Sequence, residues 1–360
     1  MMGKRKTIYD VAMEAGVSTA TVSRVISGKG YVSEDTRQKV LAASGDYHPS
    51  SLAAGIRSSR SMTIGIIINH KPDYFFLNTI YLSALRAISV VLKEYGYRMM
   101  LDIGEDENES LNLYYEGKVD GLLLMGVKQS SRLIHKMSEE KIPFVLIGCY
   151  EAEGSEKVAQ VDINDRMAAK KAVEHLIYLG HKKIGIISGS MEYASCRNRI
   201  EGYKDALNSA NLPVNADYIK VCDNLSTVMA EHLAKELLFS PDSITAIMCF
   251  NDMVALSVYK AAKSMGIHIP EQLSIIGFDD SEIAAYASPP LTTVWQPGYE
   301  KGEKAARMLV TALQNNTIPE EKIVLNCVMI YRESCAGYVP DMAGPDPVRH
   351  IRKALTDGSF

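Results

Sequence analysis

The chain has 360 residues, of which 47% are hydrophobic and 23% charged, and this length is enough for two or three folding units. Residues 1–60 hold nine basic and five acidic side chains, a net charge of +4, whereas the whole chain carries −4, which leaves −8 on residues 61–360. We therefore expect contact with nucleic-acid phosphates only from the N-terminal part, because the remainder would repel them.

Cysteine usage and the start of the chain exclude further classes of protein. The six cysteines form no Cys-x-x-Cys pair and none of the histidine spacings of a zinc site, so we expect reduced thiols, no metal and no cofactor. The start MMGKRKTIYD is basic, but no apolar segment follows it, and no stretch approaches about 18 apolar residues. Export and membrane insertion are not indicated, and we expect a cytoplasmic protein.

Residues 7–28, TIYDVAMEAGVSTATVSRVISG, predict two short helices joined by a tight turn. Thr7 and Asp10 have the spacing of a capping box, in which both side chains bond amides of the first turn. Gly16 supplies the permissive backbone of the turn, and Ser18 is a typical cap for the second helix. The pattern is typical of a helix-turn-helix, although an ordinary amphipathic helical hairpin has the same periodicity.

The second helix has one apolar face and one face of mostly small side chains. Val22 and Val25 can pack inward against Val11 and neighbouring alanines. The positions that point elsewhere are Thr19, Ala20, Ser23 and Arg24. Small side chains let a helix approach base edges closely, and an arginine can form two hydrogen bonds with guanine. We therefore expect this face to read DNA in the major groove.

Three strings, Ile-Tyr-Asp-Val-Ala, Ala-Gly-Val-Ser and Ala-Thr-Val-Ser-Arg-Val, resemble the N-terminal signature of the lactose-repressor/galactose-repressor family of bacterial transcription regulators. The resemblance continues to about Ser334, and residues 32–41 resemble the third helix of the family. It implies a small all-α DNA-binding head over residues 1–47. The implied DNA contacts are Thr7, Ile8, Tyr9, Ser18, Thr19, Ala20, Thr21, Ser23, Arg24 and Ser33, with the hydroxyls of Ser18, Thr21 and Ser33 on phosphates.

Residues 48–61, HPSSLAAGIRSSRS, resemble the hinge helix of the family and the linker after it. In the family this helix orders on DNA and places an apolar side chain in the minor groove, which kinks the duplex. The resemblance implies DNA contacts for Leu52, Ala53 and Ile56. Two departures from the family pattern weaken the expected hinge, because Gly55 lowers helix propensity and the segment before Pro49 is shorter than usual.

From Met62 the sequence alternates β-rich runs such as MTIGIIIN, RMMLDI, GLLLMG and FVLIG with helical stretches, which predicts a parallel α/β sheet. The rhythm restarts after Asp162, so we expect two doubly wound halves. The resemblance implies a periplasmic-binding-protein-like body over residues 62–335 that binds an effector and forms a dimer, with crossovers near Asp162, Leu291 and Leu325. Its subdomains would comprise residues 62–162 with 292–325 and residues 163–291 with 326–335. Residues 336–360 predict a disordered tail.

Polar and aromatic residues follow the predicted strands. In open α/β sheets, ligands bind beyond the carboxyl ends of the strands, so we expect these residues to line a cleft between the halves. Amides and carboxylates there would bind ligand hydroxyls, and aromatic rings would cover the apolar face of a sugar. The resemblance adds an arginine, Arg199, that clamps the effector. The expected effector contacts are Asn69, Tyr74, Phe75, Met125, Arg199, Phe250, Asn251, Asp279, Trp295 and Gln296.

Several of these residues also have a purely structural interpretation. Arg199 can be a surface cation of its helix, Asn251 can cap the next helix, and Trp295 can be a half-buried anchor on a crossover. Asp162 and Asn164 are expected to stabilise the first crossover rather than to contact the effector.

Together these features predict a homodimeric transcription regulator, a repressor of carbohydrate-utilisation genes that binds a pseudopalindromic operator and responds to a saccharide or sugar phosphate. An alternative keeps the DNA-binding head but makes a phosphorylated carrier protein the regulatory partner. A sugar-acting enzyme is disfavoured, because the sequence has no Gly-x-Ser-x-Gly elbow, no Walker-type loop and no His-Glu-x-x-His motif.

Overall fold

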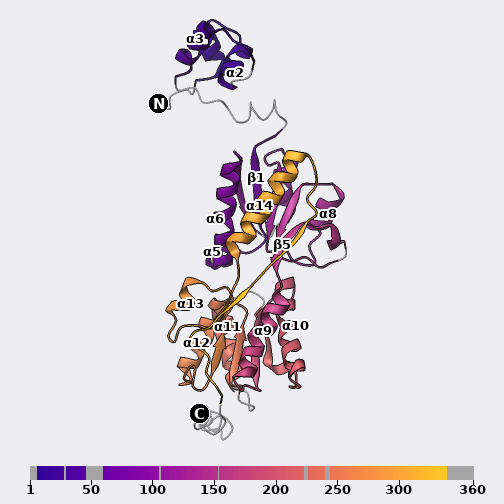
Figure 1. Ribbon diagram of the computed structural model, residues 1–360, viewed down its shortest axis with the longest axis vertical. Coiled ribbons are helices and arrows are strands. Elements are labelled where there is room, and N and C mark those ends of the chain that lie inside the picture. Colours follow the sequence, from indigo (N-terminus) through magenta and orange to yellow (C-terminus); the bar gives the residue numbers. More distant parts are fainter. Residues whose placement is uncertain are drawn as a thin grey trace. The chain divides into compact units, whose positions relative to one another are not determined.

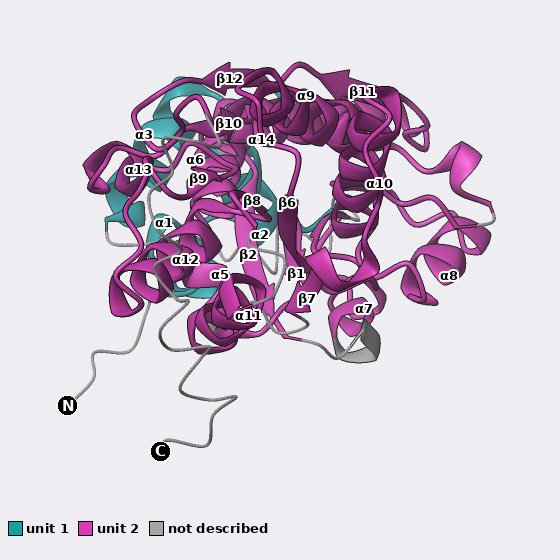
Figure 2. Ribbon diagram, turned by 90° about the horizontal axis from the view of Figure 1, so that it is seen from below, with its two compact units in different colours: residues 1–62 teal, residues 63–360 magenta. Residues whose placement is uncertain are grey.

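Residues 6–27, 30–45, 60–104, 107–152, 154–222, 226–239 and 244–338 are described by the computed structural model. The chain divides into two units, Met1–Met62 and Thr63–Phe360 (Figure 2). The expected hinge contacts Leu52, Ala53 and Ile56 lie outside the described residues, as does the expected tail beyond Tyr338.

The first unit contains the three expected helices, α1 (Ile8–Ala15), α2 (Thr19–Ser27) and α3 (Glu34–Ser44). The capping box of α1 is present, since the Thr7 hydroxyl accepts a hydrogen bond from the Asp10 amide and the Asp10 carboxylate accepts one from the Thr7 amide. Gly16 ends this helix in the left-handed region at φ +65°. The local sequence signals therefore suffice to define the helix-turn-helix.

The core of the first unit is small and is built from one face of each helix. Its buried members are Val11, Ala12, Val22, Val25, Val40 and Ala43. Lys6 connects the start of the unit to α3 through a hydrogen bond, in which its ammonium donates to the Ala43 carbonyl at 2.7 Å. The valines predicted to pack inward do so.

The second unit is built around two parallel sheets. The larger sheet contains β1 (Thr63–Ile68), β2 (Arg98–Ile103), β3 (Gly121–Met125), β4 (Phe144–Ile147), β5 (Gln160–Ile163) and β11 (Lys322–Leu325), in the order β11-β5-β4-β3-β1-β2. The smaller sheet contains β6 (Ile184–Gly189), β7 (Ile219–Cys222), β8 (Ala246–Cys249) and β9 (Ser274–Ile276), in the order β7-β6-β8-β9. A third, antiparallel pair joins β10 (Thr293–Trp295) to β12 (Val328–Ile330).

Helices cover both faces of each sheet (Figure 1). The helices of this unit are α5 (Pro72–Leu77), α6 (Thr79–Glu94), α7 (Glu107–Tyr115), α8 (Leu133–Glu139), α9 (Asp165–Tyr178), α10 (Ala194–Ser209), α11 (Thr227–Phe239), α12 (Asp252–Ser264), α13 (Glu282–Tyr286) and α14 (Gly298–Asn315), with single turns at Ser155–Lys157 and Ala216–Tyr218. Helices α6 and α14 pack on one face of the larger sheet, and α7 and α8 pack on the other. On the smaller sheet, α9 and α10 pack on one face, and α11 and α12 pack on the other.

Strand β1 illustrates how the sequence specifies these layers. Ile64, Ile66 and Ile68 pack with α6 and α14, whereas Ile67 packs with the α7 and α8 side. Successive side chains of a strand point to opposite faces, so a strand buried on both faces reads as a continuous apolar run. The predicted fold class, a helical head with a doubly wound α/β body, is confirmed.

Two features of the body were not expected from the sequence. Residues 160–163 form β5, whose short run AQVDI did not stand out among the longer apolar segments. The ordered body also extends to Tyr338, whose amide donates to the Leu179 carbonyl at 2.7 Å, although we expected the tail to begin at residue 336. In the part of the chain that the structure describes, none of the helices has the length and apolar character needed to cross a membrane. The subdomain boundaries within the body remain predictions.

The strand order determines where a ligand can bind. In the larger sheet the order reverses between β1 and β3, and in the smaller sheet it reverses between β6 and β8. Helices that follow the two strands at such a point lie on opposite faces, which leaves a crevice at the carboxyl ends. A ligand site is therefore expected at the carboxyl ends of β1, β3, β6 and β8.

Close packing of α14 against α6 gives a test of the fold. A Cβ on Gly302 would meet the carbonyl oxygen and the Cα of Ala84, both of which are backbone atoms that cannot move aside. Gly302→Ala should therefore lower the free energy of unfolding of the body by about 1–3 kcal/mol, measured by urea denaturation. Gly104→Ala is the matched control, because no atom lies within 4 Å of its Cβ, and it should cause no loss. Equal stability of the two variants would contradict the packing described here.

Candidate functional site

The outward face of α2 has the composition expected for contact with base edges. Ala20 and Arg24 are exposed, and Thr19 and Ser23 are half-buried. On α1, Tyr9 is largely exposed, whereas Ile8 packs against the helical core. Ala20 and Arg24 are therefore accessible for the predicted contacts with bases, and Thr19 is partly accessible.

Two of the three hydroxyls predicted to bind phosphates, those of Ser18 and Ser33, are helix caps in this structure, and the third, that of Thr21, lies in the first turn of α2. Ser18 Oγ accepts from the Thr21 amide at 3.2 Å, and Ser33 Oγ accepts from the Thr36 amide at 3.4 Å. Thr21 Oγ1 lies 3.0 Å from Ser18 Oγ. Because these residues begin helices, their neighbouring amides form the positive helix ends that favour a phosphate. Their role at DNA remains a prediction.

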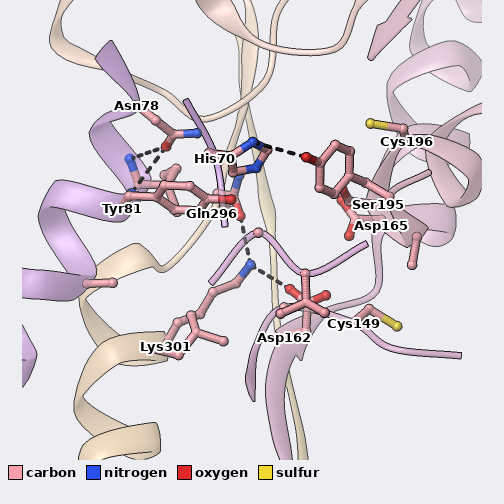
Figure 3. Close-up of a pocket in the computed structure, with 18 of the residues that line it drawn as sticks. His70, Asn78, Tyr81, Cys149, Asp162, Asp165, Ser195, Cys196, Gln296 and Lys301 are labelled. Atoms are coloured by element: carbon pink, nitrogen blue, oxygen red, sulfur yellow. Dashed lines mark hydrogen bonds and ion pairs between the residues drawn. The ribbon is translucent and has the colours of Figure 1, made fainter. Parts of the chain in front are cut away.

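A pocket lies at the carboxyl ends of the two sheets of the body (Figure 3). Its empty space is about 850 Å³, a volume that includes the part open to solvent. His70 and Gly126 follow β1 and β3, and Tyr193 and Phe250 follow β6 and β8, so the wall comes from both reversals of strand order.

Five of the ten predicted effector residues line this pocket. They are Tyr74, Arg199, Phe250, Asp279 and Gln296. The other five do not line it. Asn69, Phe75 and Met125 are buried in the body, and Phe75 packs against Tyr81 instead. Asn251 caps α12 through a 2.9 Å hydrogen bond from the Val254 amide, and Trp295 pairs with Val328 in the antiparallel ribbon. For Asn251 and Trp295 the geometry favours the structural interpretation.

Arg199 is the most enclosed cation of the pocket. Its Nε donates to Asp165 Oδ1 at 2.7 Å, and its Nη1 donates to the Phe250 carbonyl. The guanidinium carbon lies 4.5 Å from the centre of the Phe250 ring and 3.5 Å from that of Phe278. The surface-cation interpretation of Arg199 is therefore wrong, because the side chain is buried and has a charged partner. Arg199 is nevertheless part of the pocket lining.

Asp279 also lines the pocket, and its backbone is unusual. Its φ of +113° and the φ of +54° at Asp280 lie in the region that favours glycine, so the loop after β9 stores strain at the pocket. Burial raises the pKa of Asp279 to about 7, although the positive charge of Arg199 partly opposes this shift. Gln296 Nε2 donates to its Oδ1. Asp279 is thus a hydrogen-bond acceptor whose charge changes near neutral pH.

A second buried ion pair joins Lys301 to Asp162, and Gln296 connects this pair to Asp279. Lys301 Nζ donates to Asp162 Oδ1 at 2.6 Å and to Gln296 Oε1 at 3.0 Å (Figure 3). Hydrogen bonds therefore link Asp162, Lys301, Gln296 and Asp279 in one chain across the pocket. The expectation that Asp162 only stabilises a crossover was incomplete, because it also lines the pocket.

Aromatic rings form the remaining wall. His70 lies with its ring centre 4.6 Å from that of Tyr74 and 4.7 Å from that of Tyr193, and its Nδ1 is 3.2 Å from the Tyr193 hydroxyl. Burial lowers the pKa of His70 to about 4, with Lys128 adding to the effect, so this ring is neutral at pH 7. Ring faces and paired charges together suit a ligand with an apolar face and several polar groups.

Sequence reasoning missed His70, Asn78, Tyr81, Asp162, Asp165, Tyr193 and Lys301 as pocket residues. The strand-end rule would have found His70 one residue beyond Asn69, and it would have found Asp162 and Asp165 had β5 been predicted. No sequence signal distinguishes Lys301 from the other lysines of its helix.

Comparison with known proteins follows the same division of the chain. The profile of bacterial regulatory proteins of the lacI family matches residues 7–50, and that of a periplasmic binding protein-like domain matches residues 173–335. Catabolite control protein A of Priestia megaterium is 34% identical over 336 residues, which cover 91% of this chain and 98% of that protein. HTH-type transcriptional repressor PurR of Photobacterium profundum is 31% identical over 335 residues, again 91% of this chain and 98% of that protein.

Solved structures resemble this one over nearly its whole length. The complex of the transcriptional regulator CelR with cellobiose has a TM-score of 0.73 and 28% identity, and the match covers 92% of this chain and 100% of that one. The lac repressor dimer bound to operator and an anti-inducer has a TM-score of 0.81 with 92% and 100% coverage, but at 23% identity it supports the fold alone.

The two ion pairs of α9 and α10 give a matched test of burial. Asp165→Ala leaves the buried Arg199 without its carboxylate and should lower the free energy of unfolding by about 3–5 kcal/mol. Asp205→Ala removes the partner of Arg166 at the surface and should lower the free energy of unfolding far less than Asp165→Ala does. Chemical denaturation measures both, and a loss of under about 1 kcal/mol for Asp165→Ala would contradict the buried arrangement.

Proposed function

Because the chain belongs to the lacI family of bacterial regulatory proteins, which are transcription regulators and not enzymes, we propose that it is a repressor of carbohydrate-utilisation genes controlled by a hydroxyl-bearing effector. The observation that carries the effector proposal is the pocket, where side chains from both sheets converge around paired charges and aromatic rings. Such a lining suits a saccharide better than an apolar ligand.

The DNA contacts follow from the exposed face of α2. Thr19, Ala20 and Arg24 read base edges in the major groove, and Ser18, Thr21 and Ser33 begin helices whose amides face phosphates. Leu52, Ala53 and Ile56 enter the minor groove when the hinge orders on DNA. One helix reads too few bases for specific binding, so two copies of the chain bind a pseudopalindromic operator.

The dimer uses the edge of the larger sheet beside α6. Strand β2 is an edge strand, and its Met99 and Leu101 are each 40% exposed. Leu82 and Val90 on α6 are also exposed. Apolar side chains on an open edge favour association with a second copy, because pairing removes them from water.

The effector controls DNA binding by holding the two sheets of the body together. His70 and Tyr193 meet across the pocket, and Lys128 pairs with Glu192 at 2.9 Å nearby. An exposed ion pair such as Lys128–Glu192 contributes only about 0–1 kcal/mol. A ligand that contacts both walls therefore changes the closed population substantially, and with it the relative positions of the two hinges of a dimer.

A second candidate retains the DNA-binding head but makes a phosphorylated carrier protein the regulator. The similarity to Catabolite control protein A favours this candidate, whereas the buried polar pocket favours a small molecule. Thermal-shift measurements against mono- and disaccharides, their phosphates and purines separate the two, because a ligand at about 100 times its Kd adds roughly 2.7 kcal/mol of stability. Stabilisation by none of these compounds would favour the carrier protein.

Arg24 tests the DNA-binding surface. Arg24→Ala removes a side chain able to form two hydrogen bonds with guanine, so it should weaken operator binding by about 1–3 kcal/mol and relax the preference at one base pair of each half-site. Selection of binding sites from a random library, followed by titration of the selected duplex, measures both effects. Unchanged affinity with an unchanged selected sequence would show that Arg24 does not read a base.

Asp279 tests the pocket through pH. A ligand hydroxyl that donates to Asp279 binds the ionised form, so affinity should rise as pH increases toward the pKa of about 7 and level off above it. Calorimetry at a series of pH values on both sides of this pKa, with the stabilising saccharide, should show this profile for the wild type. The profile should be flat for Asp279→Asn, which retains an acceptor for Gln296. A pH-dependent profile that survives in Asp279→Asn would assign the titration to another group.

A further inference from the structure

Asp162 presents a buried oxygen without a hydrogen-bond partner. The residue is 7% exposed at the end of β5, and its Oδ1 accepts from Lys301. Within the described part of the chain, its Oδ2 is buried and accepts from no donor. Buried carboxylate oxygens are almost always hydrogen-bonded, so an exception in the wall of a pocket indicates a partner from outside the chain.

Lys301 offers the complementary group. Its ammonium has three N–H donors, of which Asp162 Oδ1 and Gln296 Oε1 use two among the described residues. Both Asp162 and Lys301 belong to the side of the larger sheet, since β5 is one of its strands and α14 packs on it (Figure 1). A free acceptor and a remaining donor thus lie on one wall of the pocket, joined by the 2.6 Å contact.

We propose that Asp162 and Lys301 form a hydroxyl-binding pair that makes the pocket select a neutral polyhydroxylated ligand over its phosphate ester. One ligand hydroxyl donates to Asp162 Oδ2 and accepts from Lys301 Nζ. A hydroxyl is both donor and acceptor, and therefore matches this pair, whereas a ligand ammonium would be repelled by Lys301. The inference rests on the proposed function, in which this pocket holds the effector.

The charge balance of the pocket also disfavours a phosphate. Three carboxylates, Asp162, Asp165 and Asp279, line the pocket with two cations, Lys301 and Arg199. Each cation already has a carboxylate partner, at 2.6 Å for Lys301 and 2.7 Å for Arg199. An ionised phosphate oxygen has no proton to donate to Asp162 Oδ2, and it would be repelled by the negative charge of that carboxylate.

The test compares neutral sugars with their phosphates on full-length protein. Thermal-shift and calorimetric titrations use cellobiose, D-glucose, D-galactose, D-ribose and adenosine, together with glucose 6-phosphate and ribose 5-phosphate. The wild type should bind a neutral compound at least about 100-fold more tightly than its phosphate. Tighter binding of a phosphate would overturn the inference while leaving a small-molecule effector in place.

Variants then locate the hydroxyl. Asp162→Asn should weaken the best neutral ligand about 10- to 100-fold, because a charge-assisted hydrogen bond is lost. Monodeoxy analogues of that ligand should include one that loses a similar factor in the wild type and almost nothing further in Asp162→Asn, which a double-mutant cycle measures. Asp205→Asn, at a surface pair outside the pocket, should leave affinity within about twofold of the wild type.

Loss of one buried charge can prevent folding, so the double variant Asp162→Asn with Lys301→Met removes both charges together. It should fold and show the same loss of affinity and a reduced preference for the neutral sugar. If either folded variant binds the sugar as the wild type does, and the deoxy losses persist, then Asp162 Oδ2 is satisfied only by water and the inference is wrong. If the wild type binds no sugar, nucleoside or phosphate, the proposed small-molecule effector fails as well.

Discussion

The buried guanidinium of Arg199 is the interaction on which the rest of the pocket depends. Its contacts join three separate elements, because Asp165 begins α9, Arg199 lies on α10 and the Phe250 carbonyl follows β8. A charge in this position is tolerated only when its partner and its hydrogen bonds are all in place. The contacts of Arg199 must therefore form when the body folds. As a result, this wall of the pocket is already in place before a ligand binds.

The series of hydrogen bonds from Asp162 to Asp279 lies on the connection between the two sheets. Lys301 and Gln296 belong to the segment that returns from the smaller sheet to the larger one, so the chain of hydrogen bonds follows the crossover itself. The loop at Asp279 is held in a strained conformation and contacts this segment directly. A ligand hydroxyl that binds Asp162 and Lys301 would act on the connection between the halves and not on a surface loop, and a small effector could alter their relative position in this way.

The sequence predicted the helical head almost completely and the pocket only in part, and the reason is the range of the interactions. Capping by Thr7 and Ser18 depends on residues three positions away, so it can be recognised locally. Tyr74 and Phe75 are neighbours on a helix and point in different directions, so only one of them could reach the pocket. Asn251 accepts a hydrogen bond from the adjacent helix amide and does not line the pocket, so its role at the effector stays a prediction.

The role of Lys301 could not be predicted from the sequence, because its partner is distant along the chain. Lys301 and Lys304 are equally plausible surface residues of an amphipathic helix, yet Lys301 meets a carboxylate 139 positions earlier in the chain. Its position is set by the close approach of α14 to α6, where Gly298 and Gly302 bring the two backbones into contact near Ile80 and Ala84. Because the two backbones are already in contact, a shift of the α14 backbone on ligand binding cannot be absorbed between the helices. It would move α6 as well, and α6 carries part of the apolar face proposed to form the dimer.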